Sequence, residues 1–381
     1  MRMYIWSTLL AAMLGSVAQA GNVSAVVSGG HLYLYGDVGG SSLTVESPAS
    51  GQIQVTGTVT ATGESTVVNG QANGTVVLSG WTRGIYSYGY AGNDTLMLTG
   101  LMVNGPTHVD MGDGDDALVV GELPTNEPTN GQADIDTAAF NSTQSLFVLG
   151  VRGNDMVILN NLFVQAAATL DLGAGEDDVF IGGGTAGTNG DGSPSVEFHE
   201  SCVIIPGSEA DDINIASASV RRNLIVDDSS GPMLLDITDV SVGDSTFIYG
   251  TPSNDRITTE NLTVTNILKV IAEGGDDVVM LNSSSNSTEV FPGAGNDSVE
   301  LMAVTTNRAY VYLDPGNDAL QIQGGSYNFL YGYGSSGNDL FQIQNAMIGQ
   351  ANLYGEAGTD TYSDGGGNSI GKLNLYTIEN K

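Results

Sequence analysis

The chain has 381 residues, of which 43 are acidic and 10 are Lys or Arg, so its formal net charge at pH 7 is −33. A surface of this charge repels nucleic acid, anionic lipid and acidic polysaccharide, and we expect no nucleic-acid partner. Apolar residues make up 41% of the chain and charged residues only 14%, which favours a buried core over disorder. Cys202 is the only cysteine, so an intrachain disulfide is excluded.

Residues 1–20 (MRMYIWSTLLAAMLGSVAQA) have the pattern of an export signal. Arg2 precedes an apolar run, and Val17-Ala18-Gln19-Ala20 has the small-x-small form of a signal-peptidase site. The run is too short for a membrane anchor, so we expect no transmembrane segment after cleavage. The sequence therefore predicts an exported bacterial protein, secreted or at the cell surface, whose mature part is residues 21–381.

The mature part is predicted to be a single solenoid with three regions. Residues 21–90 are interpreted as degenerate coils, because "GDVGGSSLTVES" (36–47) and "QANGTVVLSG" (71–80) resemble repeats that lack an Asp. Residues 91–365 carry Asp-bearing coils, and residues 366–381 are a terminal strand. At about 21 residues per coil, the mature part would form about 17 coils stacked at ~4.8 Å.

The repeat is an Asp that follows a Gly-rich turn and precedes a short apolar strand. Aligned on this residue, Asp255, Asp276, Asp297, Asp318, Asp339 and Asp360 are separated by five steps of 21 residues, and Asp94, Asp116, Asp155, Asp177 and Asp211 by 22, 39, 22 and 34. We interpret the 39 as two periods with a degenerate turn at 131–140, and the 34 as one period with an insertion at 183–195. The 44 residues from Asp211 to Asp255 predict a worn copy at 227–237.

Each copy contains three short apolar runs separated by three turns. In "GNDMVILNNLFVQAAATLDLGAGEDD" (153–178), the runs are 156–159, 162–164 and 169–172. Three strands and three corners in about 21 residues are typical of one coil of a parallel β-helix. The 53 glycines fit such corners, since Gly tolerates positive φ. The predicted fold class is therefore all-β, a parallel β-helix or β-solenoid.

The turn has the form G-x-G-x-D-x-U, where U is apolar, as in "GDGDDALVV" (112–120) and "GAGNDSVEL" (293–301). It resembles the haemolysin-type RTX nonapeptide, which implies Ca²⁺ bound by Asp carboxylates and backbone carbonyls of stacked turns. The first glycine of that motif is often missing here, with Met111, Leu172 and Pro292 in its place. With one motif per coil and the closing stretch "GNSIGKLNLYTIEN" (367–380), the layout looks closer to secreted GND-repeat proteins of planctomycete-type bacteria.

Stacked turns would also place carboxylates in one line, where neighbouring charges repel and a hard cation such as Ca²⁺ would neutralise them. The candidate ligands are the aspartates of the turns, with three acid-rich turns around Asp115, Asp177 and Asp276 as the strongest candidates. They are Asp94, Asp113, Asp115, Asp116, Asp155, Asp177, Asp178, Asp211, Asp255, Asp276, Asp277, Asp297, Asp318, Asp339 and Asp360. The alternative is a hydrogen-bonded ladder of Asn and Asp side chains that needs no metal.

The sequence offers no clear catalytic constellation, so we expect no enzyme. The few Arg and Lys residues are scattered, and Arg221-Arg222 is interpreted as an ion-paired surface feature. Aromatic residues alternate at 86–90 and at 327–333, which suits either stacking between coils or contact with carbohydrate. We therefore expect a structural or adhesive solenoid with calcium, cell-surface polysaccharide or other surface proteins as partners. The alternatives are a carbohydrate-active β-helix and a metal-free scaffold.

Overall fold

The computed structural model describes residues 21–61, 63–121, 140–182 and 195–380, and all 37 of its elements are β-strands. The chain divides into two compact units, unit 1 up to His199 and unit 2 from Glu200 onward. The predicted export signal lies outside the described residues, as do all but the last residue of the predicted turn at 131–140 and of the predicted insertion at 183–195.

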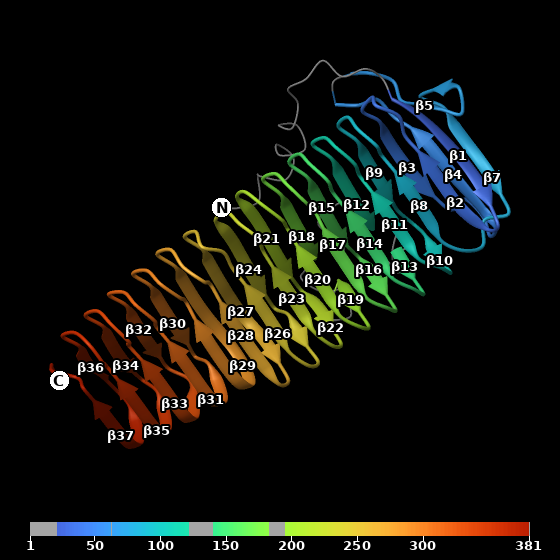
Figure 1. Ribbon diagram of the computed structural model, residues 1–381. Helices are drawn as coiled ribbons and strands as arrows, with labels where there is room; N and C mark the ends of the chain where they lie inside the picture. Colours follow the sequence, from blue (N-terminus) through green and yellow to red (C-terminus); the bar gives the residue numbers. More distant parts are fainter. Residues whose placement is uncertain (1–20, 62, 122–139, 183–194, 381) are drawn as a thin grey trace. The chain divides into compact units, whose positions relative to one another are not determined.

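Unit 1 is a parallel β-solenoid of three strand stacks, which Figure 1 shows in blue to green. The first stack contains β2 (His31–Tyr35), β8 (Ile85–Tyr88), β11 (Thr107–Asp110), β14 (Leu146–Leu149) and β17 (Ala168–Asp171). The second contains β3 (Ser42–Glu46), β9 (Thr95–Leu98), β12 (Ala117–Gly121), β15 (Met156–Asn160) and β18 (Asp178–Gly182). The third contains β10 (Met102–Val103), β13 (Phe140–Ser142), β16 (Leu162–Val164) and β19 (Val196–Phe198).

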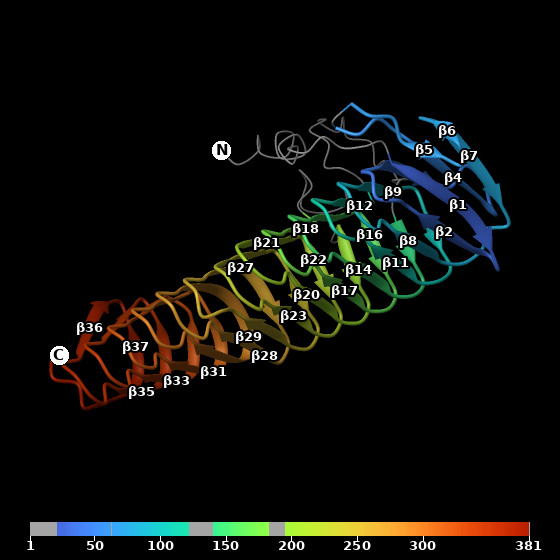
Figure 2. The same ribbon diagram turned by 45° about the horizontal axis from the view of Figure 1, so that its top comes forward.

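The N-terminal part of unit 1 departs from the predicted coils. The strands β1 (Asn22–Ser28), β4 (Gln52–Gly57) and β7 (Thr75–Ser79) pair antiparallel, β1 with β2 and β4 with both β3 and β7. The short strands β5 (Val67–Val68) and β6 (Gln71–Ala72) form a small hairpin beside β1 (Figure 2). The repeat copy expected at 36–47 does belong to a coil of the solenoid, because β3 pairs parallel with β9. The copy expected at 71–80 belongs to an antiparallel sheet instead.

Unit 2 has the same three stacks, with longer strands that turn corners without a break. The first stack contains β20 (Cys202–Ile205), β23 (Leu224–Asp227), β26 (Thr246–Tyr249) and β28 (Ile267–Ile271), followed by the C-terminal parts of β29 (Val278–Phe291), β31 (Thr305–Tyr312), β33 (Ser326–Tyr333), β35 (Met347–Tyr354) and β37 (Ser369–Tyr376). The second contains β21 (Asp211–Ala216), β24 (Met233–Thr238), the first part of β27 (Arg256–Val264), the start of β29, β30 (Ser298–Met302), β32 (Ala319–Gln323), β34 (Leu340–Gln344) and β36 (Thr361–Gly366).

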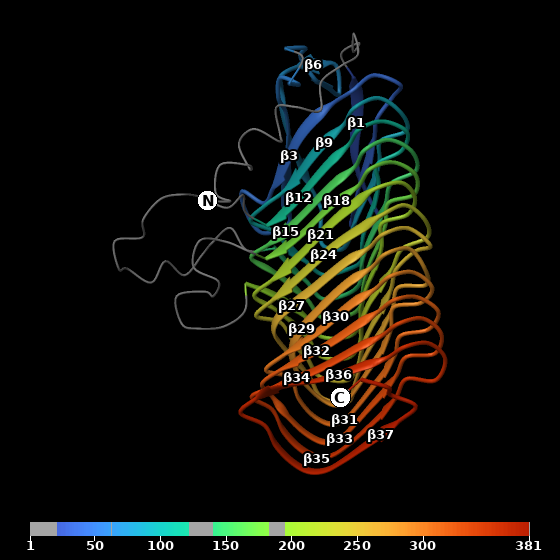
Figure 3. The same cartoon turned by 90° about the vertical axis from the view of Figure 1, so that its left-hand side faces the viewer.

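The third stack of unit 2 begins with β22 (Ala218–Val220) and β25 (Ser241–Val242), and the second part of β27 continues it. Figure 3 shows β30, β32, β34 and β36 side by side on the second stack. All of these pairings in unit 2 are parallel, as the predicted solenoid requires.

The core consists of columns of apolar side chains that repeat from coil to coil. On β32, Leu320 and Ile322 are buried, and their partners on β34, Phe341 and Ile343, are buried as well. Because side chains alternate across a strand, the residues between them face solvent. One coil cannot cover its own apolar residues, so each coil depends on its neighbours for burial.

The described residues form about 12 turns with a spacing of roughly 22 residues, fewer than the 17 expected. One reason is the antiparallel N-terminal part. Another is that β12 pairs directly with β15, so Asp116 and Asp155 lie in adjacent coils, one period apart and not two. By contrast, the predicted worn copy at 227–237 is confirmed, since β24 lies between β21 and β27.

Candidate metal-binding turns

The turns between the first and second strand stacks place one side chain per coil in an inner line. Its members occupy equivalent positions in successive coils. Each is the last residue of its turn, directly before a second-stack strand or at the first residue of that strand. We call this set the inner line: Asp94, Asp116, Asp155 and Asp177 in unit 1, and Asp211, Asp255, Asp277, Asp297, Asp318, Asp339 and Asp360 in unit 2. Asp94 is half-buried, and each of the others is at most 3% exposed.

Backbone hydrogen bonds hold the inner line along the coil stack. In unit 1, the N–H of Asp94 donates to Oδ1 of Asp116 at 2.6 Å, Asp116 to Asp155 at 2.9 Å, and Asp155 to Asp177 at 2.7 Å. In unit 2, one N–H per coil likewise donates to Oδ1 of the next line member, over 2.7–3.0 Å. The donors are Met233, Asp255, Asp277, Asp297, Asp318 and Asp339. Each carboxylate therefore reaches back toward the preceding coil and caps its turn.

The two ends of the described line are closed by other side chains. At the N-terminal end, the backbone N–H and Oγ of Ser41 donate to Oδ1 of Asp94 at 2.6 and 2.8 Å. At the C-terminal end, the N–H of Asp360 donates to Oε2 of Glu379 at 2.9 Å. Ser41 and Glu379 are line members that the Asp pattern does not reveal, because neither belongs to a G-x-D turn.

The second oxygen of most inner-line carboxylates is buried without a hydrogen-bond partner. This holds for Oδ2 of Asp94, Asp116, Asp155, Asp277, Asp297, Asp318, Asp339 and Asp360. Asp255 differs, because its Oδ2 accepts the N–H of Thr251 at 2.7 Å. A buried charged oxygen without a partner is costly, so the line needs protons or cations to neutralise it.

Burial raises the pKa of several inner-line carboxyl groups well above the ordinary value of 3.8. The pKa rises to about 9 at Asp116 and about 8 at Asp277, where burial is the largest cause and the neighbouring line carboxylates add to it. Burial also raises the pKa of Asp94, Asp155 and Asp318 to about 7, and that of Asp297 and Asp339 to about 6. The pKa values of these seven carboxyl groups thus lie on both sides of neutral pH.

A second, outer row of side chains occupies the residue before each line member. In unit 2, Asn296, Asn317 and Asn338 follow one another, and each Oδ1 accepts the N–H of the next row residue at 2.9–3.1 Å. The amide groups of Asn317 and Asn338 also donate along the row at 3.1 and 3.2 Å. The amide ladder considered as the alternative to metal binding therefore exists here, and it runs in the direction opposite to the inner line.

Asp276 belongs to this outer row and not to the inner line, so the predicted set of five equal steps is wrong by one residue. Asp276 is exposed, its Oδ1 accepts the N–H of Asn296 at 2.7 Å, and Asp277 takes the inner position. With Asp277 in the line, the step from Asp255 is 22 residues and the step to Asp297 is 20. The stretch "GGDD" (274–277) contains two adjacent aspartates, and the 21-residue period predicts the outer one as the line member.

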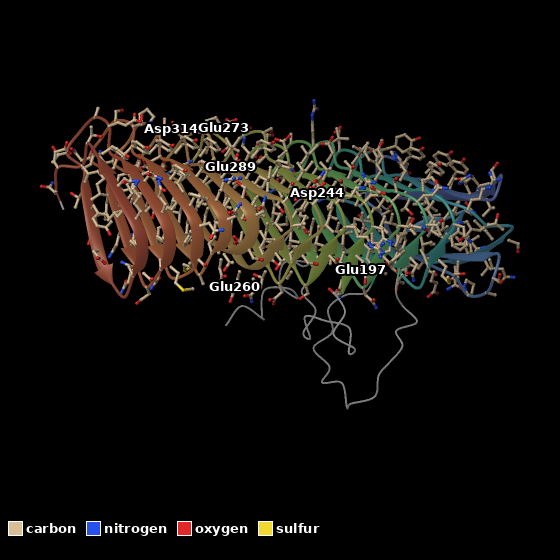
Figure 4. All side chains as sticks on the ribbon, turned by 90° about the horizontal axis from the view of Figure 1, so that it is seen from below. Glu197, Asp244, Glu260, Glu273, Glu289 and Asp314 are labelled. Carbon is tan, nitrogen blue, oxygen red and sulfur yellow. The ribbon has the colours of Figure 1, made fainter. Side chains whose placement is uncertain are left out.

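The acid-rich turns do not bring their carboxylates together. Asp115 and Glu176 belong to the outer row, where Oδ1 of Asp115 accepts the N–H of Asn154 at 3.0 Å. Asp113 is exposed, and Asp178 is half-buried at the start of β18. Glu273 and Asp314 lie along one edge of unit 2, and Glu260 along the opposite edge (Figure 4). In the part of the chain that the structure describes, no three His, Cys, Asp or Glu side chains form a metal-type cluster.

Glycines stand two residues before most line members and let the turns stack closely, whereas Asp211 and Asp255 have Glu209 and Ser253 at this position. A Cβ on Gly337 would lie 1.3 Å from the carbonyl oxygen of Gly316, and one on Gly358 would lie 1.5 Å from that of Gly337. Both glycines have φ near +140 to +150°, a region that side chains disfavour. Hard carboxylate oxygens thus lie in turns lined with backbone carbonyls, and these are the donor types that Ca²⁺ prefers.

The residue five positions before each line member faces the inner carboxylate. Where it is Gly, the Oδ2 atom lies close to it: a Cβ on Gly250 would be 2.3 Å from Oδ2 of Asp255, and one on Gly355 would be 2.2 Å from Oδ2 of Asp360. Where it is not Gly, the side chain is buried, as for Met111, Leu172 and Pro292. This is the position of the missing first glycine, which is tolerated because the position faces the interior.

Aromatic side chains form a third set of rows, on the outer surface of the first stack. In unit 2, Phe291, Tyr312, Tyr333, Tyr354 and Tyr376 stack with centroids 4.5–5.0 Å apart and planes within 7°. Tyr327 does not belong to the predicted alternating row, because it is buried on the other side of a corner. The row supports stacking between coils, since each ring covers the face of the next one.

The predicted surface pair Arg221-Arg222 is confirmed in part, since Nε of Arg222 lies 2.5 Å from a carboxylate oxygen of Glu200. No helix in the described ranges is long and apolar enough to cross a membrane.

Comparisons with known proteins give little further information. No family model matches the chain, and no curated protein matches it. Among solved structures, the chain is similar to a hyperactive, Ca²⁺-dependent, β-helical antifreeze protein from an Antarctic bacterium, with 18% identity, a TM-score of 0.48, and coverage of 73% of this chain and 78% of that one. A similarity of this degree gives no evidence about function.

Proposed function

We propose that the protein is an exported structural or adhesive β-solenoid whose turns bind Ca²⁺ along the inner line. The observation that supports this proposal is the set of buried Oδ2 atoms without hydrogen-bond partners, one per coil over most of the described line. Bound Ca²⁺ would supply the positive charge that these oxygens lack, and turn carbonyls would complete its oxygen ligands. The protein would then gain stability from calcium outside the cell.

The inner line itself already has a structural role that needs no metal. Its Oδ1 atoms cap backbone N–H groups, so the chain can form the turns before any ion binds. Calcium would act on the remaining oxygen by replacing a proton or by removing repulsion between adjacent carboxylates. Its effect would be a change in stability and not in the fold of the coils.

The aromatic rows do not favour the carbohydrate-active alternative. Sugar rings stack on the faces of aromatic side chains, and the rings from Phe291 to Tyr376 cover each other's faces. The row therefore fits contacts between coils better than a sugar subsite.

The test is a series of thermal unfolding curves of the purified protein in EDTA, in millimolar Ca²⁺ and in Mg²⁺ at equal ionic strength. We expect a rise in the unfolding midpoint that is specific to calcium, because ligands that bind only the native state stabilise it by mass action. Identical midpoints in all three solutions would contradict calcium binding and leave the line as a hydrogen-bonded ladder. N-terminal sequencing of the exported protein tests export separately, with Gly21 as the expected first residue.

A further inference from the structure

One coil of unit 2 lacks the inner-line carboxylate. Met233 is paired with Asp211 on one side, and the residue after it, Leu234, is paired with Arg256 on the other, so Met233 stands where the other coils have Asp. Its N–H still donates to Oδ1 of Asp255 at 2.8 Å, but its side chain is apolar and buried. The N–H of Asp211 donates to the carbonyl of Pro232 instead, at 3.2 Å.

The same coil is unusual at the position five residues earlier. In the other coils of unit 2, this position holds Pro206, Gly250, Ala272, Pro292, Leu313, Gly334 or Gly355. In the Met233 coil it holds Asp228, the only charged residue of this column in the described part of unit 2. Asp228 is 5% exposed, and its Oδ1 accepts the N–H of Ser229 at 2.7 Å.

The pairing of the coils shows where this carboxylate points. Asp227 is paired with Tyr249, and the N–H of Asp228 donates to the carbonyl of Tyr249 at 3.1 Å, so Asp228 is the counterpart of Gly250. At Gly250, a Cβ would lie 2.3 Å from Oδ2 of the line carboxylate of the same coil. The side chain of Asp228 therefore enters the space that the carboxylate of an Asp at 233 would occupy. Its Oδ2 is buried without a hydrogen-bond partner.

We propose that Asp228 supplies, from the opposite side of the turn, the carboxylate that Met233 does not supply, and so gives this coil its place in the cation-binding line. The second part of this statement rests on the proposed calcium function, whereas the first part does not. The cation would be a hard divalent ion with oxygen ligands, as in the neighbouring coils. Compared with the neighbouring coils, Asp228 and Met233 exchange the side of the turn that bears the carboxylate.

The exchange can be reversed in the laboratory, which gives a direct test. Met233→Asp alone would direct two carboxylates into one space, and we expect the unfolding midpoint in EDTA at neutral pH to fall by about 3–6 °C. Adding Asp228→Gly should recover most of this loss, because the double variant has the Gly and Asp of an ordinary coil. Met233→Asn directs a side chain of the same shape but without charge into this space, so we expect a smaller fall of the midpoint than for Met233→Asp. Asp228→Gly should recover this loss as well, so the Asn variant serves if Met233→Asp does not fold.

The matched control is Asp227→Asn, which removes a charge from the adjacent but exposed residue and should leave the midpoint unchanged. If the effects of Met233→Asp and Asp228→Gly simply add, the two side chains do not share a space and the inference is wrong. This outcome is read in EDTA, so it does not depend on calcium binding.

The second part of the proposal, that Asp228 belongs to the cation-binding line, is tested by measuring the response to calcium. If the wild-type midpoint rises with Ca²⁺, Asp228→Gly should reduce that rise and the number of bound ions, and the double variant should restore both. A calcium response unchanged by Asp228→Gly would overturn the role of Asp228 in the line. An absent response in the wild type would overturn the proposed function and this second part, while the coupling in EDTA still tests the first.

Discussion

At the scale of single residues, the inner line shows two separate uses of one carboxylate. Oδ1 of Asp318 accepts the N–H of Asp297 at 2.7 Å, whereas its Oδ2 is buried without a partner. The first contact favours folding, and the second opposes it whenever the group is charged. A substitution that removes both oxygens and one that keeps the Oδ1 acceptor but removes the charge should therefore change the unfolding free energy in different directions.

Asp318→Ala and Asp318→Asn make this separation. The Ala variant leaves the buried N–H of Asp297 without an acceptor, and we expect it to lose about 1–3 kcal/mol of unfolding free energy. The Asn variant keeps the acceptor and removes the charge, so in EDTA at neutral pH it should be at least as stable as the wild type. Urea unfolding measures both, and an Asn variant as unstable as the Ala variant would contradict this assignment.

A glycine of the stacked turns gives a second prediction at this scale. Gly337→Ala would place a Cβ against the carbonyl oxygen of Gly316 at a φ of +139°, so we expect a loss of at least about 2 kcal/mol. Gly366→Ala is the control, because its φ of +83° is also positive but no atom lies within 4 Å of its Cβ position. Equal losses in the two variants, measured by thermal unfolding, would show that close stacking is not the cause.

At the scale of elements, the coil repeats three kinds of row: the inner carboxylates, the outer amides and the aromatic rings of the first stack. Each row links one coil to the next through contacts that a single coil cannot make. Removing a side chain from the middle of a row should therefore lower the unfolding free energy more than a substitution that keeps the contacts with both neighbouring coils.

Tyr333 is the middle of the longest aromatic row. Tyr333→Ala removes its contacts with Tyr312 and Tyr354, whose ring centroids lie at 4.7 and 5.0 Å, and we expect a loss of about 1–3 kcal/mol. Tyr333→Phe keeps both stacked contacts and should change the unfolding free energy little. Chemical denaturation compares the two, and a Phe variant as unstable as the Ala variant would mean that the hydroxyl, not the stacking, matters.

The strands and most of the inner line could be predicted from sequence, because each coil repeats the same apolar pattern and the same Gly-x-Asp turn. The choice between adjacent acids could not: Asp276 and Asp277 differ only in which one the preceding turn directs inward. Alternation likewise predicts the wrong face for Tyr327, since a corner at 328–329 interrupts the strand pattern. The motif does not reveal Asp228 either, because Asp228 occupies a position where the motif has a glycine.

At the scale of the whole molecule, the number of coils depends on features that periodicity cannot detect. The 39 residues from Asp116 to Asp155 look like two repeats, yet β12 and β15 are direct neighbours. In the N-terminal part, β4 and β7 have the same alternating apolar pattern as coil strands but pair antiparallel. Strand patterns report which face of a strand is buried, and not which strand lies beside it.

The inner line also determines how the stability of the molecule depends on pH. Because burial raises the pKa of line carboxyls above the unfolded value of 3.8, the native state binds protons more tightly than the unfolded state. The resulting stability is fully present below about pH 4 and is lost as pH rises through the native pKa values of about 6–9. Bound calcium would remove this loss, since it stabilises the charged form.

The most direct test is the unfolding midpoint of the purified protein between pH 4 and pH 9, measured once in EDTA and once in millimolar Ca²⁺. We predict a midpoint that falls as pH rises in EDTA, and a nearly constant midpoint in Ca²⁺, so that the two curves separate above about pH 6. Two curves that coincide over the whole range would contradict the claim that the buried carboxylate line binds calcium.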